Sequence, residues 1–169
     1  MNIENWLLHR GISPKVANQL ISHLPSEQVD ESYLDFFTAE YIMKNNDENI
    51  PEHQGYIEIG SGLDGTTIAL DVRSNSGEIH YLPITCLETI DYDPRLVAVK
   101  VAESPDDFVK RSVNAGFPPG HWDAIELLPE KEAKRISNQI FYGSDEKPQD
   151  EEKDQDKITL TDDLIDPFA

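Results

Sequence analysis

The stretch 55–83 constrains the fold most, because it holds three short apolar runs that are separated by two glycine-bearing turns. The runs 56–59, 66–72 and 78–82 are rich in β-branched and aromatic residues, which favour strands. The reversal at 74–77 reads Ser-Asn-Ser-Gly, a composition that tolerates positive φ in a tight turn, so the second and third runs should pair. We therefore predict a three-stranded antiparallel meander.

The turn between the first two runs, 60–65, matches the G-x-G-x-x-G pattern of dinucleotide-binding loops. Such a loop must open a helix, because the amide groups and dipole at the helix start bind the pyrophosphate. Here the next residues, 66–72, read Thr-Thr-Ile-Ala-Leu-Asp-Val, which predicts a strand. We therefore expect a plain glycine-rich turn and no cofactor.

The charge of the chain indicates what kind of partner it can bind. The chain has 33 acidic and 14 basic residues, a net charge of −19, and residues 1–142 alone hold 23 acids and 11 bases. This balance argues against nucleic acid as a ligand, because phosphate binding needs a patch of Lys and Arg. It favours a basic protein partner, and the alternative is an anionic surface that only maintains solubility.

Helical patterns precede and follow the meander. Ser13 and Pro14 form a typical helix start, with Ser at the N-cap and Pro at the first helical position. Ser104 and Pro105 repeat this arrangement later in the chain. The predicted elements outside the meander are helices over 3–8, 14–24, 38–44, 105–114 and 129–140, and a strand over 96–101 that is buried on both faces.

The composition changes at residue 143 and indicates where the folded part ends. Residues 143–157 have no apolar side chain to offset their ordering entropy. We predict one α+β domain over 1–142, a single curved, mainly antiparallel sheet flanked by helices, and a disordered acidic tail over 143–169. Within the domain we expect N-terminal helices over about 1–48, the sheet region over about 55–101 and C-terminal helices over about 104–141.

Several classes of site are not supported by the residue types. No run approaches the roughly 18 apolar residues of a membrane helix, and the start lacks the features of a signal peptide, so we expect a cytoplasmic protein that binds no membrane. The single cysteine, Cys86, excludes an internal disulfide. No compact ligand pair or nucleophile with an adjacent base is visible, so we predict no metal site and no catalytic residues. The histidines are scattered over five positions: His9, His23, His53, His80 and His121.

Short motifs between residues 37 and 113 carry a family resemblance. They are the helix over 38–49, Tyr-Ile-Glu-Ile-Gly with Leu-Asp-Gly within 56–65, Ile-Ala-Leu-Asp-Val and Gly-Glu-Ile-His-Tyr within 68–81, and the helix start within 101–109. In this order they resemble the SUKH superfamily, which contains bacterial toxin-immunity proteins and fungal cell-wall-synthesis regulators. The resemblance implies an α+β fold with one curved sheet and no catalytic chemistry.

Three functional hypotheses follow. The first, from the resemblance and the charge, is a non-catalytic immunity protein that binds and neutralises a basic polymorphic toxin domain. The second is a regulatory scaffold or adaptor of the same fold that acts through its acidic tail. The third is a hydrolase that uses the carboxylates or Ser61.

Acidic residues in the turns of the sheet region are the predicted contacts with a partner. Loops on a rigid scaffold are free to carry function, and we expect Asp64, Glu88, Asp91 and Asp93 to present a concentrated negative target to a basic cleft. The alternative is that the last two of these acids only cap local amide groups in their turn.

Overall fold

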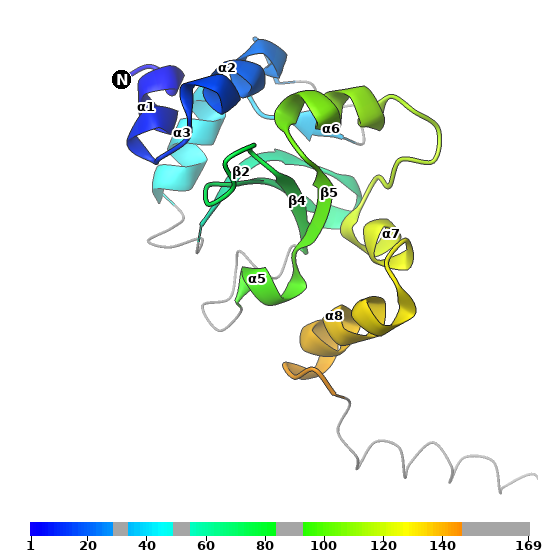
Figure 1. Ribbon diagram of the computed structural model, residues 1–169. Coiled ribbons are helices and arrows are strands. Elements are labelled where there is room, and N and C mark those ends of the chain that lie inside the picture. Colours follow the sequence, from blue (N-terminus) through cyan, green and yellow to red (C-terminus); the bar gives the residue numbers. More distant parts are fainter. Residues whose placement is uncertain (29–33, 49–54, 84–92, 147–169) are drawn as a thin grey trace, which may run out of the picture. The chain divides into compact units, whose positions relative to one another are not determined.

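The structure is a computed structural model that describes residues 1–28, 34–48, 55–83 and 93–146 (Figure 1). The chain divides into two compact units, Met1–Pro129 and Glu130–Ala169. Most of the predicted disordered tail lies outside the described residues, as do Cys86, Glu88 and Asp91. In the part that the structure describes, no helix has the length and apolar character needed to cross a membrane.

The first unit is built on a five-stranded sheet in which each pair of neighbouring strands is antiparallel. The strands follow one another across the sheet in chain order, so the predicted meander and the predicted α+β class are confirmed. Ile57 pairs with Leu70, and Leu70 pairs in turn with Ile79. The strands are β1 (Asp35–Phe36), β2 (Tyr56–Ser61), β3 (Thr67–Asp71), β4 (Ile79–Leu82) and β5 (Val99–Ala102).

Period-two alternation gives the sheet one wholly apolar face over its central strands. The buried residues of this face are Ile57, Ile68, Leu70, Ile79, Tyr81 and Val99. The opposite face becomes polar toward the β3–β4 turn, where Asp71 and His80 lie beside Tyr56 and Lys100. This polar end contains the candidate site that is described below.

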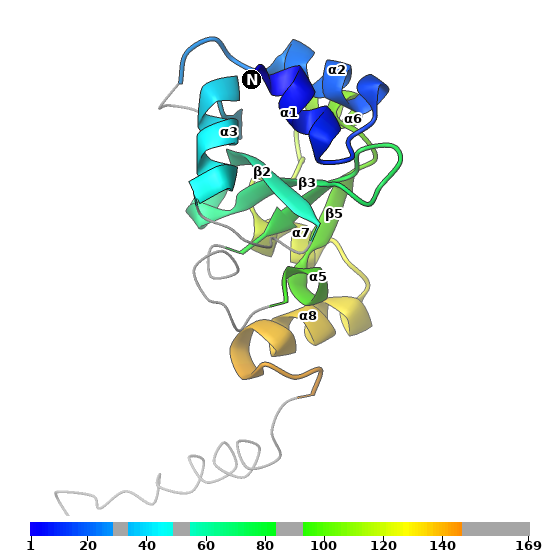
Figure 2. The ribbon, with the colours of Figure 1, turned by 90° about the vertical axis from the view of Figure 1, so that its left-hand side faces the viewer.

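The helices that flank the sheet lie above it and beside β2 in Figure 1, and Figure 2 shows the same arrangement after a quarter turn. Phe108 of the last of these helices connects it to the sheet, because its ring lies 5.5 Å from that of Phe36 and 6.3 Å from that of Tyr81. The predicted caps are confirmed: Ser13 accepts from the amide of Val16, and Ser104 caps the last helix in the same way. The helices are α1 (Ile3–His9), α2 (Pro14–His23), α3 (Ala39–Glu48) and α6 (Pro105–Ser112).

The prediction of a strand over 96–101 is partly wrong. The segment Pro94–Val97 forms a short helix, α5, because Asp93 accepts a hydrogen bond from the amide of Arg95 (3.0 Å) and Pro94 occupies the first helical turn. The strand itself, β5, starts at Val99. Its burial is one-sided, since Lys100 is exposed between two buried valines.

Three short elements were not predicted: β1, the single turn η1 (Leu63–Gly65) and α7 (His121–Glu126). The helix α7 contacts β4 and β5, and the amide of His121 donates to the hydroxyl of Thr66 (2.8 Å). No side chain caps this helix, whose N-cap is Gly120. The usual start signal is therefore missing from the sequence, which explains why the helix was not found.

The described residues of the second unit contain one helix, α8 (Glu130–Tyr142), close to the predicted range 129–140. Arg135 pairs with Glu132 one turn earlier, at 2.7 Å. The side-chain amide of Gln139 donates to the carboxylate of Asp145 (2.5 Å), so the residues after the helix fold back on its last turn.

Candidate functional site

The β3–β4 hairpin brings three potential metal ligands together. Asp71 ends β3, Glu78 directly precedes β4, and His80 lies within β4. The amide of Asp71 donates to the carbonyl of Glu78 (2.9 Å), so these residues stand opposite each other, and His80 follows on the same face. Their ligand atoms lie within 4.8 Å of one another, the one such group of His, Cys, Asp and Glu in the described part of the chain.

Two cationic side chains complete this group, which we call the hairpin cluster: Asp71, Arg73, Glu78, His80 and Lys100. The guanidinium of Arg73 binds both carboxylate oxygens of Asp71, at 3.0 and 3.2 Å. The Lys100 ammonium lies 3.6 Å from Glu78 and 2.9 Å from Glu103, which is outside the cluster. The cluster therefore matches two carboxylates with two cations.

The imidazole of His80 faces both carboxylates of the cluster. Its Nε2 lies 3.3 Å from Glu78 and 3.8 Å from Asp71. Burial lowers the pKa of His80, and this effect outweighs the neighbouring carboxylates, which raise it. The ring is therefore neutral near pH 7. Burial also raises the pKa of Tyr56, whose ring lies 5.4 Å from that of His80, so a neutral phenol covers one side of the imidazole.

The signal that predicts this cluster is the register of the hairpin. A turn at 74–77 places positions 71 and 78 opposite each other, and position 80 then shares their face. Counting ligand spacings along the chain does not find the group, because six residues separate Asp71 from Glu78.

Two of the four predicted partner-binding acids are described, and they lie in different places. Asp64 is exposed in η1, just after the last residue of β2. Asp93 instead pairs with Arg95 (2.8 Å) and influences the electrostatics of Tyr56, the first residue of β2. The two acids therefore belong to opposite ends of β2 and do not form one patch. The cap of α5 by Asp93 supports the alternative prediction of turn capping for this residue.

The loop that carries Asp64 lies against the start of α7. The amide of Leu63 donates to the carbonyl of Pro119 (2.9 Å), one residue before the N-cap of α7. Asp123 lies in the first turn of α7, and Glu126 is the last residue of this short helix. We call Asp64, Asp123 and Glu126 the acidic corner, and none of the three forms an ion pair within the described residues.

The turn over 60–65 has a structural role that accounts for its glycines. A Cβ atom on Gly60 would collide with the backbone of Asp35 in β1. Gly65 has φ of 72°, and Asp64 before it has φ of 54°, so the chain reverses through the left-handed region. The strand β3 follows, as predicted, so no helix start is present to bind a pyrophosphate.

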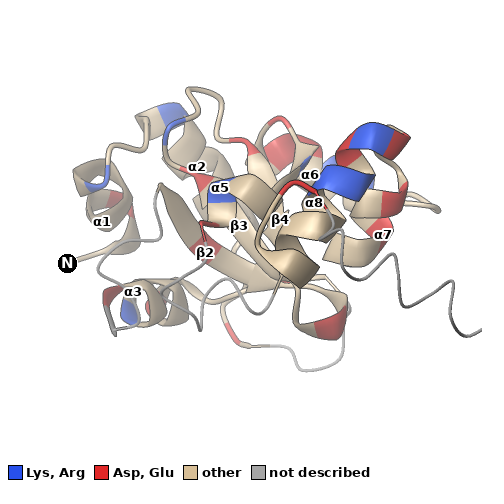
Figure 3. Ribbon diagram, turned by 90° about the horizontal axis from the view of Figure 1, so that it is seen from below, with Lys and Arg blue, Asp and Glu red and all other residues tan. Residues whose placement is uncertain are grey.

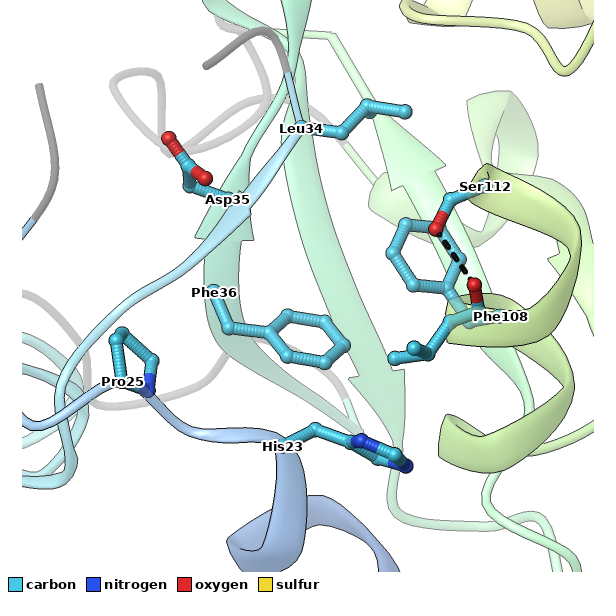
Figure 4. Close-up of a pocket in the computed structure, with 8 residues that line it drawn as sticks. His23, Pro25, Leu34, Asp35, Phe36, Phe108 and Ser112 are labelled. Atoms are coloured by element: carbon cyan, nitrogen blue, oxygen red, sulfur yellow. Dashed lines mark hydrogen bonds between the residues drawn. The ribbon is translucent and has the colours of Figure 1, made fainter. Parts of the chain in front are cut away.

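A surface pocket of about 220 Å³ lies between α2, β1 and α6 (Figure 4). The stacked rings of Phe36 and Phe108 form its apolar wall. Its polar groups are already engaged, because His23 Nε2 lies 2.7 Å from Asp106 and the hydroxyl of Ser112 donates to a carbonyl in its own helix. The geometry suits an apolar group and provides no nucleophile with a base beside it.

His121 has a structural role. Its Nε2 lies 2.6 Å from the carbonyl of Val97, and the side chain is buried. His9 is exposed at the end of α1, and His53 lies outside the described residues.

Comparisons with known proteins identify no relative: no family model matches the chain, and no curated protein or solved structure matches it.

Proposed function

We propose that this chain is a non-catalytic protein-binding module, an immunity protein that binds and neutralises a basic toxin domain in the cytoplasm. The observation that carries the proposal is how the first unit uses its charges. Residues 1–129 hold 21 acids and eight bases. Five of the eight bases are already in ion pairs with acids of the same unit: Arg10, Arg73, Arg95, Lys100 and Arg111.

This pairing leaves a surplus of carboxylates that few internal cations can neutralise (Figure 3). Surface ion pairs contribute little stability, about 0–1 kcal/mol each, so the surplus is not explained by folding energetics. A fixed negative field does accelerate association with a positively charged partner, by about tenfold to a thousandfold. Fast capture is what a protein needs if it must bind a toxin before the toxin acts.

The acidic corner is the part of this surplus that we propose as the contact. Its carboxylates stand on a turn and a helix whose backbone is held by hydrogen bonds from Leu63 to Pro119 and from His121 to Thr66, so the backbone that carries them is placed before a partner arrives. Many toxins of this kind are nucleases with basic clefts, and the SUKH resemblance supports the assignment to immunity proteins. The assignment of Asp64 as a contact is retained from the sequence, and Asp123 and Glu126 are added.

The test measures association of the full chain with the toxin domain that is encoded beside its gene. We expect the association rate to fall about tenfold or more as ionic strength rises from about 0.05 to 0.5 M, because screening weakens the steering field. The double variant Asp64→Lys with Asp123→Lys should bind more slowly still at low salt. A matched control reverses two exposed acids of other helices, Glu4→Lys with Glu40→Lys, and changes the net charge equally.

The outcomes separate the parts of the proposal. Neutralisation that is lost in the corner variant and retained in the control supports the contact. Equal effects of both variants show that only the net charge matters and contradict the corner. If no neighbouring gene product binds, or toxicity continues in its presence, the immunity function is wrong.

A further inference from the structure

We propose that Asp71, Glu78 and His80 form a binding site for a divalent transition-metal ion, with Zn²⁺ as the best fit. The site is independent of the proposed toxin binding. Two carboxylates and one imidazole are ligands that zinc accepts, and their ligand atoms lie within 4.8 Å of one another. Metal–ligand bonds to such groups are about 2.0–2.2 Å long, so one ion reaches all three after small side-chain rotations.

The backbone holds these ligands in place. Asp71 and Glu78 occupy facing positions next to the hairpin turn, and His80 follows on β4. The side chains of Asp71 and His80 are only 11% and 12% exposed, while that of Glu78 is 29% exposed. The site is therefore walled by the sheet and open on the side of Glu78. Three protein ligands leave at least one coordination position for water or an incoming group.

The two carboxylates require positive charge between or beside them. Like charges that face each other on neighbouring strands are destabilising unless cations compensate. Arg73 and Lys100 now supply this compensation, and the side chain of each is 45% exposed. Both can swing into solvent, whereas the ligands are fixed on the strands. A metal ion would thus replace the cations by exchange and would not need to open the fold.

The imidazole makes the site selective among cations. His80 Nε2 lies 3.3 Å from Glu78 and 3.8 Å from Asp71, so it stands where one ion could contact it together with both carboxylates. A metal ion would replace the hydrogen bond between His80 Nε2 and Glu78 with bonds to all three ligands. Imidazole suits zinc and its neighbours, while magnesium prefers oxygen ligands and keeps its waters.

The experiment is a calorimetric titration of the full chain with Zn²⁺, and with Mg²⁺ for comparison. We expect one Zn²⁺ site that weakens by about tenfold or more in His80→Ala and in Glu78→Gln, since loss of a ligand should cost at least as much as loss of a supporting residue. The Glu78 side chain is partly exposed, so we expect the second variant to fold, which a circular dichroism spectrum checks. His23→Ala, which removes the imidazole of another histidine–carboxylate pair, serves as the control and should bind as the wild type does.

Competition provides the sharpest result. Arg73→Ala removes the guanidinium that now holds both oxygens of Asp71, so it should tighten Zn²⁺ binding. Long-range ¹H–¹⁵N spectra should show a shift of the His80 ring nitrogens on addition of Zn²⁺. Binding that persists unchanged in His80→Ala and Glu78→Gln, or that weakens in Arg73→Ala, overturns the proposal. Equal affinity for Mg²⁺ overturns the role of the imidazole.

Discussion

The side chain of Asn46 hydrogen-bonds to the edge of β2 where no strand pairs with it. Removing this side chain tests how the edge is stabilised. The strand β1 pairs with β2 only at Gly60 and Ser61. Further along, the side chain of Asn46 in α3 takes the place of a neighbouring strand. Its amide donates to the carbonyl of Glu58 (2.8 Å), and its oxygen accepts from the amide of Glu58 (2.9 Å). One side chain thus satisfies both backbone groups of Glu58 on that edge.

The magnitude of Asn46→Ala follows from these two bonds. The residue is 8% exposed, so water has little access to the groups that the variant leaves without partners. Each orphaned backbone group costs about 1–3 kcal/mol. The gain in helix propensity from Asn to Ala offsets about 0.5–0.7 kcal/mol of this cost. We therefore expect a loss of about 2–3 kcal/mol in the free energy of unfolding, because water enters part of the space that is left.

Urea denaturation, followed by far-ultraviolet circular dichroism, measures this loss. Asn45→Ala is the matched control, because Asn45 lies next in α3 and donates to the side-chain carboxylate of Glu58. Since no backbone group of Glu58 depends on that bond, we expect a loss of about 1 kcal/mol or less. The role of Asn46 at the edge of β2 is refuted if Asn46→Ala lowers the free energy of unfolding by under about 0.5 kcal/mol, the scale of an ordinary surface substitution. It is also refuted if the loss is no larger than that of Asn45→Ala.

Two further predictions concern buried groups elsewhere in the first unit. Burial holds the pKa of His121 below its ordinary value of 6.5, so folding favours the neutral ring. The stabilising contribution of this ring should be complete above about pH 6.5. As the pH drops from there toward the folded-state pKa, stability should fall by at most about 1.4 kcal/mol per pH unit. Urea unfolding at several pH values should show a flatter dependence for His121→Gln than for the wild type, and parallel curves would contradict the assignment. Gly60→Ala should lower the free energy of unfolding by about 1–3 kcal/mol, because its Cβ meets the backbone of Asp35. The control Ser61→Ala, at the exposed neighbouring position, should change it by no more than about 0.5 kcal/mol. Equal unfolding free energies of the two variants would show that β1 shifts away from the added Cβ at no cost.

The sequence predicts the central part of the fold because its signals are local. The β-branched composition of 66–72 and the turn at 74–77 act within one hairpin, and the structure confirms the strand and its pairing with β4. The caps at Ser13 and Ser104 are equally local, since each acts on an amide three residues away. Elements of this kind need no tertiary information.

The parts that were missed depend on tertiary contacts. The strand β1 has two residues and exists because β2 lies beside it. Residues 96–97 are an exception, because they were predicted as part of the strand 96–101 although the helix signals before them, the cap by Asp93 and the position of Pro94, are local. The candidate site shows the same limit: sequence places Asp64 and Asp93 in turns, and only the fold shows that these turns lie at opposite ends of β2.

The acidic corner and the hairpin cluster differ in what surrounds their carboxylates, and this difference separates the two proposals. In the hairpin cluster two cations neutralise Asp71 and Glu78, so little field reaches solvent, and only an ion that contacts the ligands directly can compete. The corner has no internal cations among the described residues, so its field extends outward over about the 8 Å Debye length of physiological salt. Raising the salt concentration should therefore slow toxin association much more than it weakens Zn²⁺ binding, because bonds of about 2 Å lie well inside the screening length. Equal salt dependence of the two events would mean that Zn²⁺ is held by the general negative field and not by the three ligands.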